Sequence, residues 1–190
     1  MIWIRYRPAI ACNLKELDLD PQAAMRLTTR TNLAVRVLMA CAVNDGLTVR
    51  TAEIAERCNA SVNHLLQVVN LLQVNGFVET IRGRSGGLRL ARPMDRISIG
   101  KVFRIFEAGV PFAECFAPKT NTCPLAASCR LRGFIARAVE AFYRELDMVV
   151  LADLVRGNCE LGALLEMSRA LRPACREVGA GTVEMARRDA

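Results

Sequence analysis

The stretch from residue 51 to residue 90 constrains the fold of this chain more than any other part. Thr51 can begin a short helix that continues to Arg57, and after a turn of three residues Ser61 can cap a second helix. That second helix carries an apolar stripe at helical spacing, made of Val62, Leu65, Leu66, Val69 and Leu72. A short helix, a tight turn and a capped amphipathic helix predict a helix-turn-helix.

A hairpin is predicted directly after the second helix. Residues 77–81 and 88–90 alternate in the manner of strands, and the segment between them is the glycine-rich turn Arg-Gly-Arg-Ser-Gly-Gly. Glycine lets a backbone approach another surface closely, and Arg82 and Arg84 at the tip can pair with phosphates or enter a minor groove. Such a turn is also typical of a solvated hairpin, but after a helix-turn-helix it indicates a wing.

The faces of the second helix that lie outside the apolar stripe carry amides and one histidine. An amide offers a donor and an acceptor together and therefore suits the edge of adenine, whereas the alternative is an ordinary solvated face. The residues expected to contact DNA are Ser61, Asn63, His64, Gln67, Arg82, Arg84, Ser85 and Gly86.

The charge of the chain favours a polyanionic partner. The formal net charge is +7, and residues 25–95 hold nine arginines against five acidic residues, with no lysine. Neutralising phosphates releases condensed counterions, so double-stranded promoter DNA is the expected partner. No apolar run approaches the roughly 18 residues of a membrane helix and no secretory signal is recognisable, so we expect no membrane partner and a cytoplasmic location. Cysteines in that compartment are expected to be reduced.

Three cysteines follow the winged segment in a stretch that is typical of a loop. Cys115, Cys123 and Cys129 are separated by seven and five residues. Thiolates bind iron-sulfur clusters or zinc, so the spacing indicates a metal-gated switch. Zinc prefers four ligands, and a fourth is missing. A metal-free thiol switch is a further alternative, because Arg130 and Arg132 lie close by in the sequence.

A long helix after the cysteine loop is expected to pair two copies of the chain. Ser98 caps an earlier helix that ends near residues 108–111, and the long helix follows Cys129. Its near-heptad apolar positions are Leu131, Ile135, Ala138, Phe142, Leu146 and Val149. Packing within one subunit is the alternative, but a homodimer would present two reading helices to two half-sites.

The expected organisation has four parts. Residues 1–24 form an N-terminal extension, and one hypothesis is that translation begins at Met25. Residues 25–95 form a winged helix-turn-helix, residues 96–167 the cysteine loop and dimerisation helices, and residues 168–190 a disordered tail. The fold is therefore expected to be mainly α-helical. The sequence contains no serine, histidine and acid constellation and no phosphate-binding glycine loop, so no enzymatic activity is expected.

Residues 25–167 resemble the Rrf2 family of bacterial winged-helix repressors. The segments that carry the resemblance are 25–28, 32–36, 82–90 and 151–154, together with the three cysteines. Residues 63–65, 121–125 and 129–131 are most similar to the nitric-oxide-sensitive NsrR branch, and residues 31–36 and 44–46 are equally similar to the iron-responsive RirA branch.

The resemblance implies an iron-sulfur cluster bound by Cys115, Cys123 and Cys129, with a [4Fe-4S] cluster favoured and a [2Fe-2S] cluster as the alternative. It implies a dimeric repressor that leaves its promoter when nitric oxide attacks the cluster, or, as the alternative, one that responds to iron or redox status. Arg132 stands where the IscR branch has a histidine, which disfavours a two-iron site of that kind. Asn32 of the partner subunit matches a carboxylate ligand of some relatives, although a neutral amide is a poorer iron ligand.

Overall fold

The computed structural model describes residues 27–83, 86–117 and 119–167. The expected N-terminal extension (residues 1–24), Arg84 and Ser85 at the wing tip, and the expected tail (residues 168–190) lie outside the described residues.

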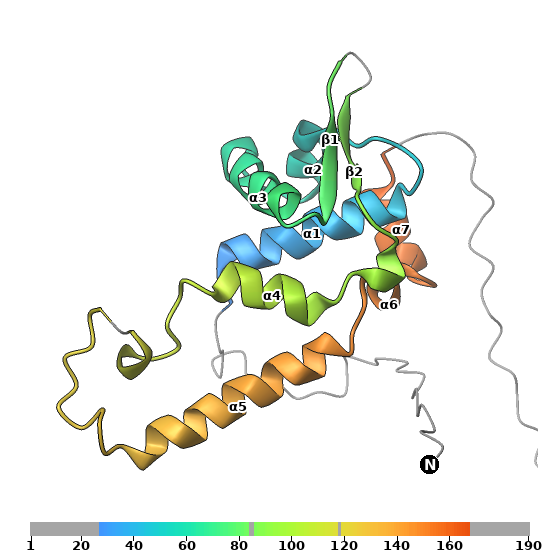
Figure 1. Ribbon diagram of the computed structural model, residues 1–190. Coiled ribbons are helices and arrows are strands. Elements are labelled where there is room, and N and C mark those ends of the chain that lie inside the picture. Colours follow the sequence, from blue (N-terminus) through green and yellow to red (C-terminus); the bar gives the residue numbers. More distant parts are fainter. Residues whose placement is uncertain (1–26, 84–85, 118, 168–190) are drawn as a thin grey trace, which may run out of the picture.

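The described chain is mainly helical, as expected, with one two-stranded antiparallel sheet (Figure 1). None of the helices within the described ranges combines the length and the apolar character needed to cross a membrane. The elements in chain order are α1 (Thr29–Val43), α2 (Thr51–Arg57), α3 (Val62–Val74), β1 (Val78–Ile81), β2 (Gly87–Leu90), η2 (Met94–Arg96), α4 (Ile99–Glu107), η3 (Glu114–Phe116), α5 (Arg130–Asp147), α6 (Leu151–Val155) and α7 (Cys159–Leu165).

Helix α1 lies at the centre of the fold and contacts α3, α4, α6, α7 and β2. Thr28 caps it, since the Thr28 side chain accepts a hydrogen bond from the backbone nitrogen of Thr31 at 3.3 Å. The helix is buried on more than one side, and Val37 and Leu38 are fully buried. Its apolar residues therefore hold the helix-turn-helix on one side and the C-terminal helices on the other.

Helices α2 and α3 form the expected helix-turn-helix, with Ser61 at the N-cap of α3. Asn59 turns the chain between them with a φ of 48°. The expected apolar stripe of α3 is wrong at two positions, because Val62 and Leu66 are exposed and Val68 is buried in their place. The buried side is formed by Leu65, Val68, Val69 and Leu72. Val62 and Leu66 lie outside this buried side and do not pack against the core.

The wing is a hairpin in which Val78 pairs with Leu90 and Ile81 with Gly87. The segment before α2 extends this sheet through a bridge between Val49 and Leu88, with hydrogen bonds of 2.9 and 2.7 Å. Glycine is required at position 87, because a Cβ there would lie 2.7 Å from the carbonyl oxygen of Val49. The base of the wing is thus fixed to the helix-turn-helix by backbone contacts.

Helix α5 packs on α4 and lies on the side of α4 that is remote from the wing (Figure 1). Arg104 of α4 donates to both carboxylate oxygens of Glu140, at 2.9 and 2.8 Å, and to Asp147 at 3.0 Å. Its guanidinium also lies 4.7 Å from the centre of the Tyr143 ring. These carboxylates raise the pKa of Arg104 above its ordinary value. One arginine therefore links three residues of α5 to α4.

The apolar stripe expected on α5 is divided between two faces. Phe142 packs toward α4, with its ring centre 6.3 Å from that of Phe103, and Leu146 packs against the core. Leu131 and Phe134, at the other end of the helix, are 63% and 61% exposed. No residue of α5 is fully buried in the single chain. A helix of 3.6 residues per turn drifts relative to a seven-residue repeat, which accounts for this division.

The last described residues form two short helices, α6 and α7, that pack against α1 and that the sequence does not predict as separate elements. The amide of Asn44 is buried and donates to the carbonyl of Leu165 at 2.8 Å, and its oxygen accepts from the backbone nitrogen of Met167 at 2.9 Å. Arg57 donates to the carbonyl of Leu164 at 3.0 Å. The C-terminal helices are thus tied to both α1 and α2.

Candidate nucleic-acid interface and cysteine loop

The expected DNA-contacting residues of α3 are all exposed. Ser61, Asn63, His64 and Gln67 lie in its first two turns, and the Ser61 side chain makes no capping hydrogen bond. Gln73, by contrast, accepts a hydrogen bond from Thr80 of β1 at 3.2 Å and connects α3 to the wing. The polar side chains that remain available therefore concentrate near the N-terminus of α3, the end with which a reading helix usually contacts base edges.

The wing presents Arg82 as an exposed side chain, while Gly86 is partly buried. A Cβ at position 86 would lie 2.8 Å from the carbonyl oxygen of Gly83, so the tight turn requires glycine there. Arg89 is paired with Glu79 across the strands at 2.5 Å, which reduces its availability for phosphate. Arg84 and Ser85 lie outside the described residues.

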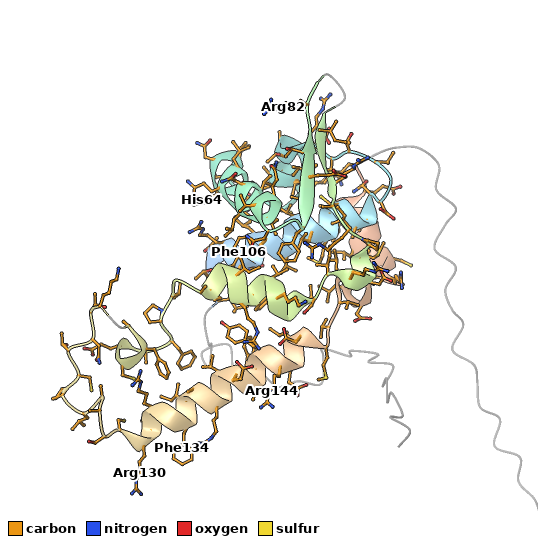
Figure 2. The ribbon with its side chains drawn as sticks, in the orientation of Figure 1. His64, Arg82, Phe106, Arg130, Phe134 and Arg144 are labelled. Atoms are coloured by element: carbon orange, nitrogen blue, oxygen red, sulfur yellow. The ribbon has the colours of Figure 1, made fainter. Side chains whose placement is uncertain are left out.

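Figure 2 shows His64 and Arg82 on the side of the molecule that is remote from α5, where Arg130, Phe134 and Arg144 are found. Both labelled side chains therefore lie on the part of the molecule opposite α5. The turn that sets the angle of α3 is held by Arg36 of α1, whose Nη1 donates to the carbonyl of Cys58 at 3.0 Å.

The cysteine loop runs from the end of α4 to the start of α5 and lies at the far end of α5 (Figure 1). Cys115, Cys123 and Cys129 are all free thiols of intermediate exposure. Cys115 lies in η3, Cys123 in an irregular segment, and Cys129 is the N-cap of α5.

One carboxylate joins the parts of the loop that carry the first two cysteines. Glu114 accepts hydrogen bonds from the backbone nitrogen of Thr122 at 2.9 Å and from its hydroxyl at 2.5 Å. These hydrogen bonds lower the pKa of Glu114. Glu114 precedes Cys115 and Thr122 precedes Cys123. The two hydrogen bonds between Glu114 and Thr122, called the Glu114 clasp below, therefore hold the two cysteine segments side by side.

The donor set fits an iron-sulfur cluster by its chemistry, since three free, partly accessible thiols share one loop. The single chain does not gather them. Among the residues that the structure describes, no group of three or more cysteine, histidine, aspartate or glutamate side chains is placed to hold one ion. A bound cluster would therefore require the loop to close further than the Glu114 clasp alone closes it.

The other described cysteines differ from this trio. Burial raises the pKa of Cys41 to about 12, so this thiol stays protonated at neutral pH. Burial also raises the pKa of Cys58, although the charge of Arg36 opposes the shift. Both are buried and pack within the core. The expectation that every cysteine is reduced is wrong at Cys159, which is disulfide-bonded.

The start of α1 is joined to the end of α4, immediately before the cysteine loop. Glu107 accepts hydrogen bonds from the backbone nitrogen and the hydroxyl of Thr28, both at 2.9 Å, and from the hydroxyl of the buried Thr31. Asn32 is the next residue along and its side chain is exposed. Asn32 is thus available to a second subunit and lies beside a residue that contacts the root of the loop.

Three polar links at the site were not foreseen, namely Glu107 with Thr28 and Thr31, Glu114 with Thr122, and Arg104 with Glu140 and Asp147. Only the second has a weak signal in the sequence, since both partners directly precede cysteines. The other two links join residues that are far apart in the chain, and no local sequence pattern predicts them.

The comparisons with known proteins agree with this fold. The Rrf2 family, described as "Iron-dependent Transcriptional regulator", matches residues 27–157. The chain is 41% identical over 146 residues to the HTH-type transcriptional regulator NsrR of Geobacillus kaustophilus, covering 76% of this chain and 99% of the relative. It is 39% identical over 149 residues to Protein aau3 of Rhizobium meliloti, covering 78% and 97%.

Among solved structures, CymR, the global cysteine regulator of B. subtilis, is similar with a TM-score of 0.53 at 25% identity, covering 69% of this chain and 96% of that one. The fold and the matched residues together define a winged-helix transcriptional regulator, which is not an enzyme. The chain belongs to the Rrf2 family.

Proposed function

We propose that this regulator is a promoter-binding repressor controlled by an iron-sulfur cluster that senses nitric oxide. The observation that carries the proposal is the loop of three free thiols, joined through α4 and α5 to a winged helix-turn-helix. The 41% identity to an NsrR supports nitric oxide as the signal. Repression takes place in the cytoplasm, where promoter DNA is accessible.

We assign DNA contact to residues 25–95. The first two turns of α3 enter the major groove with Ser61, Asn63, His64 and Gln67, and the tip of the wing, with Arg82, Arg84, Ser85 and Gly86, approaches the backbone or the minor groove. Phosphate contacts by arginine make the affinity fall steeply with added salt.

Sensing and dimerisation fall to residues 96–167. Cys115, Cys123 and Cys129 hold the cluster, and a [4Fe-4S] cluster fits three thiolates better than [2Fe-2S] without a histidine in the loop. When bound, the cluster supplies an iron that lacks a cysteine ligand and is open to small molecules. Asn32 is exposed, so Asn32 of the partner subunit is a candidate for the remaining ligand, although its neutral amide binds iron more weakly than a carboxylate.

Two links connect the loop to the DNA-contacting helices. Glu107 joins the root of the loop to the first turn of α1, and Arg36, one turn further along α1, holds the turn before α3. A change in loop closure therefore reaches α3 through α1. The exposed Leu131 and Phe134 on α5 provide the apolar surface for a second copy.

The deciding experiment is titration of the anaerobically reconstituted protein with nitric oxide, with absorbance and promoter binding followed together. A brown protein that loses its charge-transfer absorption and its promoter in parallel supports the proposal. Release on iron chelation but not on nitric oxide would favour the iron-responsive alternative. A colourless protein with stoichiometric zinc, or one that responds to oxidants without any metal, would contradict the cluster.

The cysteine loop has its own test. Cys123→Ser should abolish cluster formation and the nitric oxide response, whereas Cys58→Ser, at a buried cysteine of the turn, should retain both. A Cys123→Ser protein that still binds iron and sulfide in full would show that the loop is not the site.

A further inference from the structure

A short apolar strip interrupts the polar face of α3. Val62 and Leu66 lie one helical turn apart and are 42% and 51% exposed. Neither belongs to the core or packs against it. Leu66 is flanked on the helix surface by Asn63, Gln67 and Asn70, which are all exposed. The strip therefore sits within the surface that carries the candidate base-reading groups.

The chemistry of the major groove gives such a strip one natural partner. The 5-methyl group of thymine is the only apolar group that base pairs present there. Leucine neither donates nor accepts a hydrogen bond, so over any other base edge it would desolvate polar groups without replacing their partners. A leucine in a reading surface thus both favours thymine and disfavours the alternatives.

We infer that Leu66, with Val62 one turn before it, is a specificity-determining residue that reads the methyl group of thymine in the operator. The inference rests on the proposed function, because it requires α3 to lie in the major groove. Leu66 lies in the second turn of α3, near the N-terminal end from which reading helices contact bases.

The first step of the test changes the DNA and not the protein, by removing the 5-methyl group of thymine. A duplex is first selected from a random pool with the anaerobically reconstituted protein, and each thymine in it is then replaced by uracil, which lacks only the methyl group. At one or two positions in each half-site the wild-type protein should bind about fourfold more weakly, the effect of one buried methyl group. Leu66→Ser should bind the thymine and uracil duplexes equally at those positions.

Val74 provides the matched control, since it is an exposed apolar residue at the last position of the same helix. Val74→Ser should discriminate thymine from uracil as the wild-type protein does. Equal binding of all uracil duplexes by the wild-type protein would overturn the inference and leave the proposed function standing. Discrimination that survives in Leu66→Ser would overturn it as well. Failure to select any duplex would instead refute DNA binding itself.

Discussion

Gly100 of α4 offers a sharp test of how tightly α5 is held against the winged domain. A Cβ at this position would lie 2.5 Å from the backbone nitrogen and 2.8 Å from the Cα of Asp147 at the end of α5. Real Cβ atoms do not approach backbone atoms so closely, so the end of α5 must move when Gly100→Ala is made. That movement also disturbs the Arg104 to Asp147 ion pair.

The expected magnitude follows from two opposing effects. Alanine in a helix interior gains about 1 kcal/mol over glycine. Overpacking against backbone costs about 2–3 kcal/mol. The net change is a loss of about 1–2 kcal/mol, or roughly 2–8 °C in melting temperature for a domain of this size.

Gly162 of α7 is the matched control. It is also helical, and nothing lies within 4 Å of the position that its Cβ would take. Gly162→Ala should therefore raise the melting temperature by about 2–4 °C. Thermal unfolding followed by circular dichroism measures both variants. A Gly100→Ala protein as stable as the Gly162→Ala protein would refute the close packing of α4 against α5.

Three further predictions test other parts of the structure. Asn44→Ala should lower the free energy of unfolding in urea by about 2–3 kcal/mol, because the carbonyl of Leu165 and the backbone nitrogen of Met167 lose their hydrogen-bond partner. An unchanged urea midpoint would contradict the tie between α1 and α7. The raised pKa of Cys41 means that the folded state holds its proton more tightly, so stability should fall as pH rises from 9 toward about 12, and Cys41→Ala should show a shallower fall in urea titrations. Thr122→Val should weaken iron retention about tenfold by removing one hydrogen bond to Glu114, whereas Thr120→Val in the same loop should retain iron as the wild type does.

Local signals in the sequence were sufficient for most elements of the winged domain. The cap at Ser98, the positive-φ position at Gly83 and the spacing of Leu65, Val69 and Leu72 each act over a few residues, and the structure places α4, the wing and α3 accordingly. The helical period predicts how wide the apolar stripe of a helix is. It does not predict which edge of that stripe is buried by an adjacent helix. The period therefore predicts burial for Val62 and Leu66, and the structure shows both exposed.

The remaining features depend on contacts between distant residues. Helices α6 and α7 are only 5 and 7 residues long. Helix α7 is held by Asn44 and Arg57, and α6 by the hydrogen bond from the backbone nitrogen of Leu151 to the carbonyl of Ile97 at 2.9 Å, all between residues far apart in the chain. Arg104 meets Glu140 across 36 residues. Patterns that extend over a few residues of sequence cannot predict such long-range pairs. The three cysteines were recognisable as a set, whereas their closure around a group depends on what they bind.

The attachment of α5 at only one end has a mechanical consequence. Its C-terminal end is held on α4 by the bond between Arg104 and Asp147 and is followed by the bridge between Ser98 and Val150, while its N-terminal end carries Cys129 and the loop. A helix of 18 residues is roughly 27 Å long. A tilt of about 10° about the fixed end would swing the far end by roughly 5 Å. If two copies pair through α5 across a two-fold axis, a small rearrangement of the loop changes the distance between the two winged domains. The spacing of the two α3 helices then no longer matches the spacing of successive major grooves along the DNA.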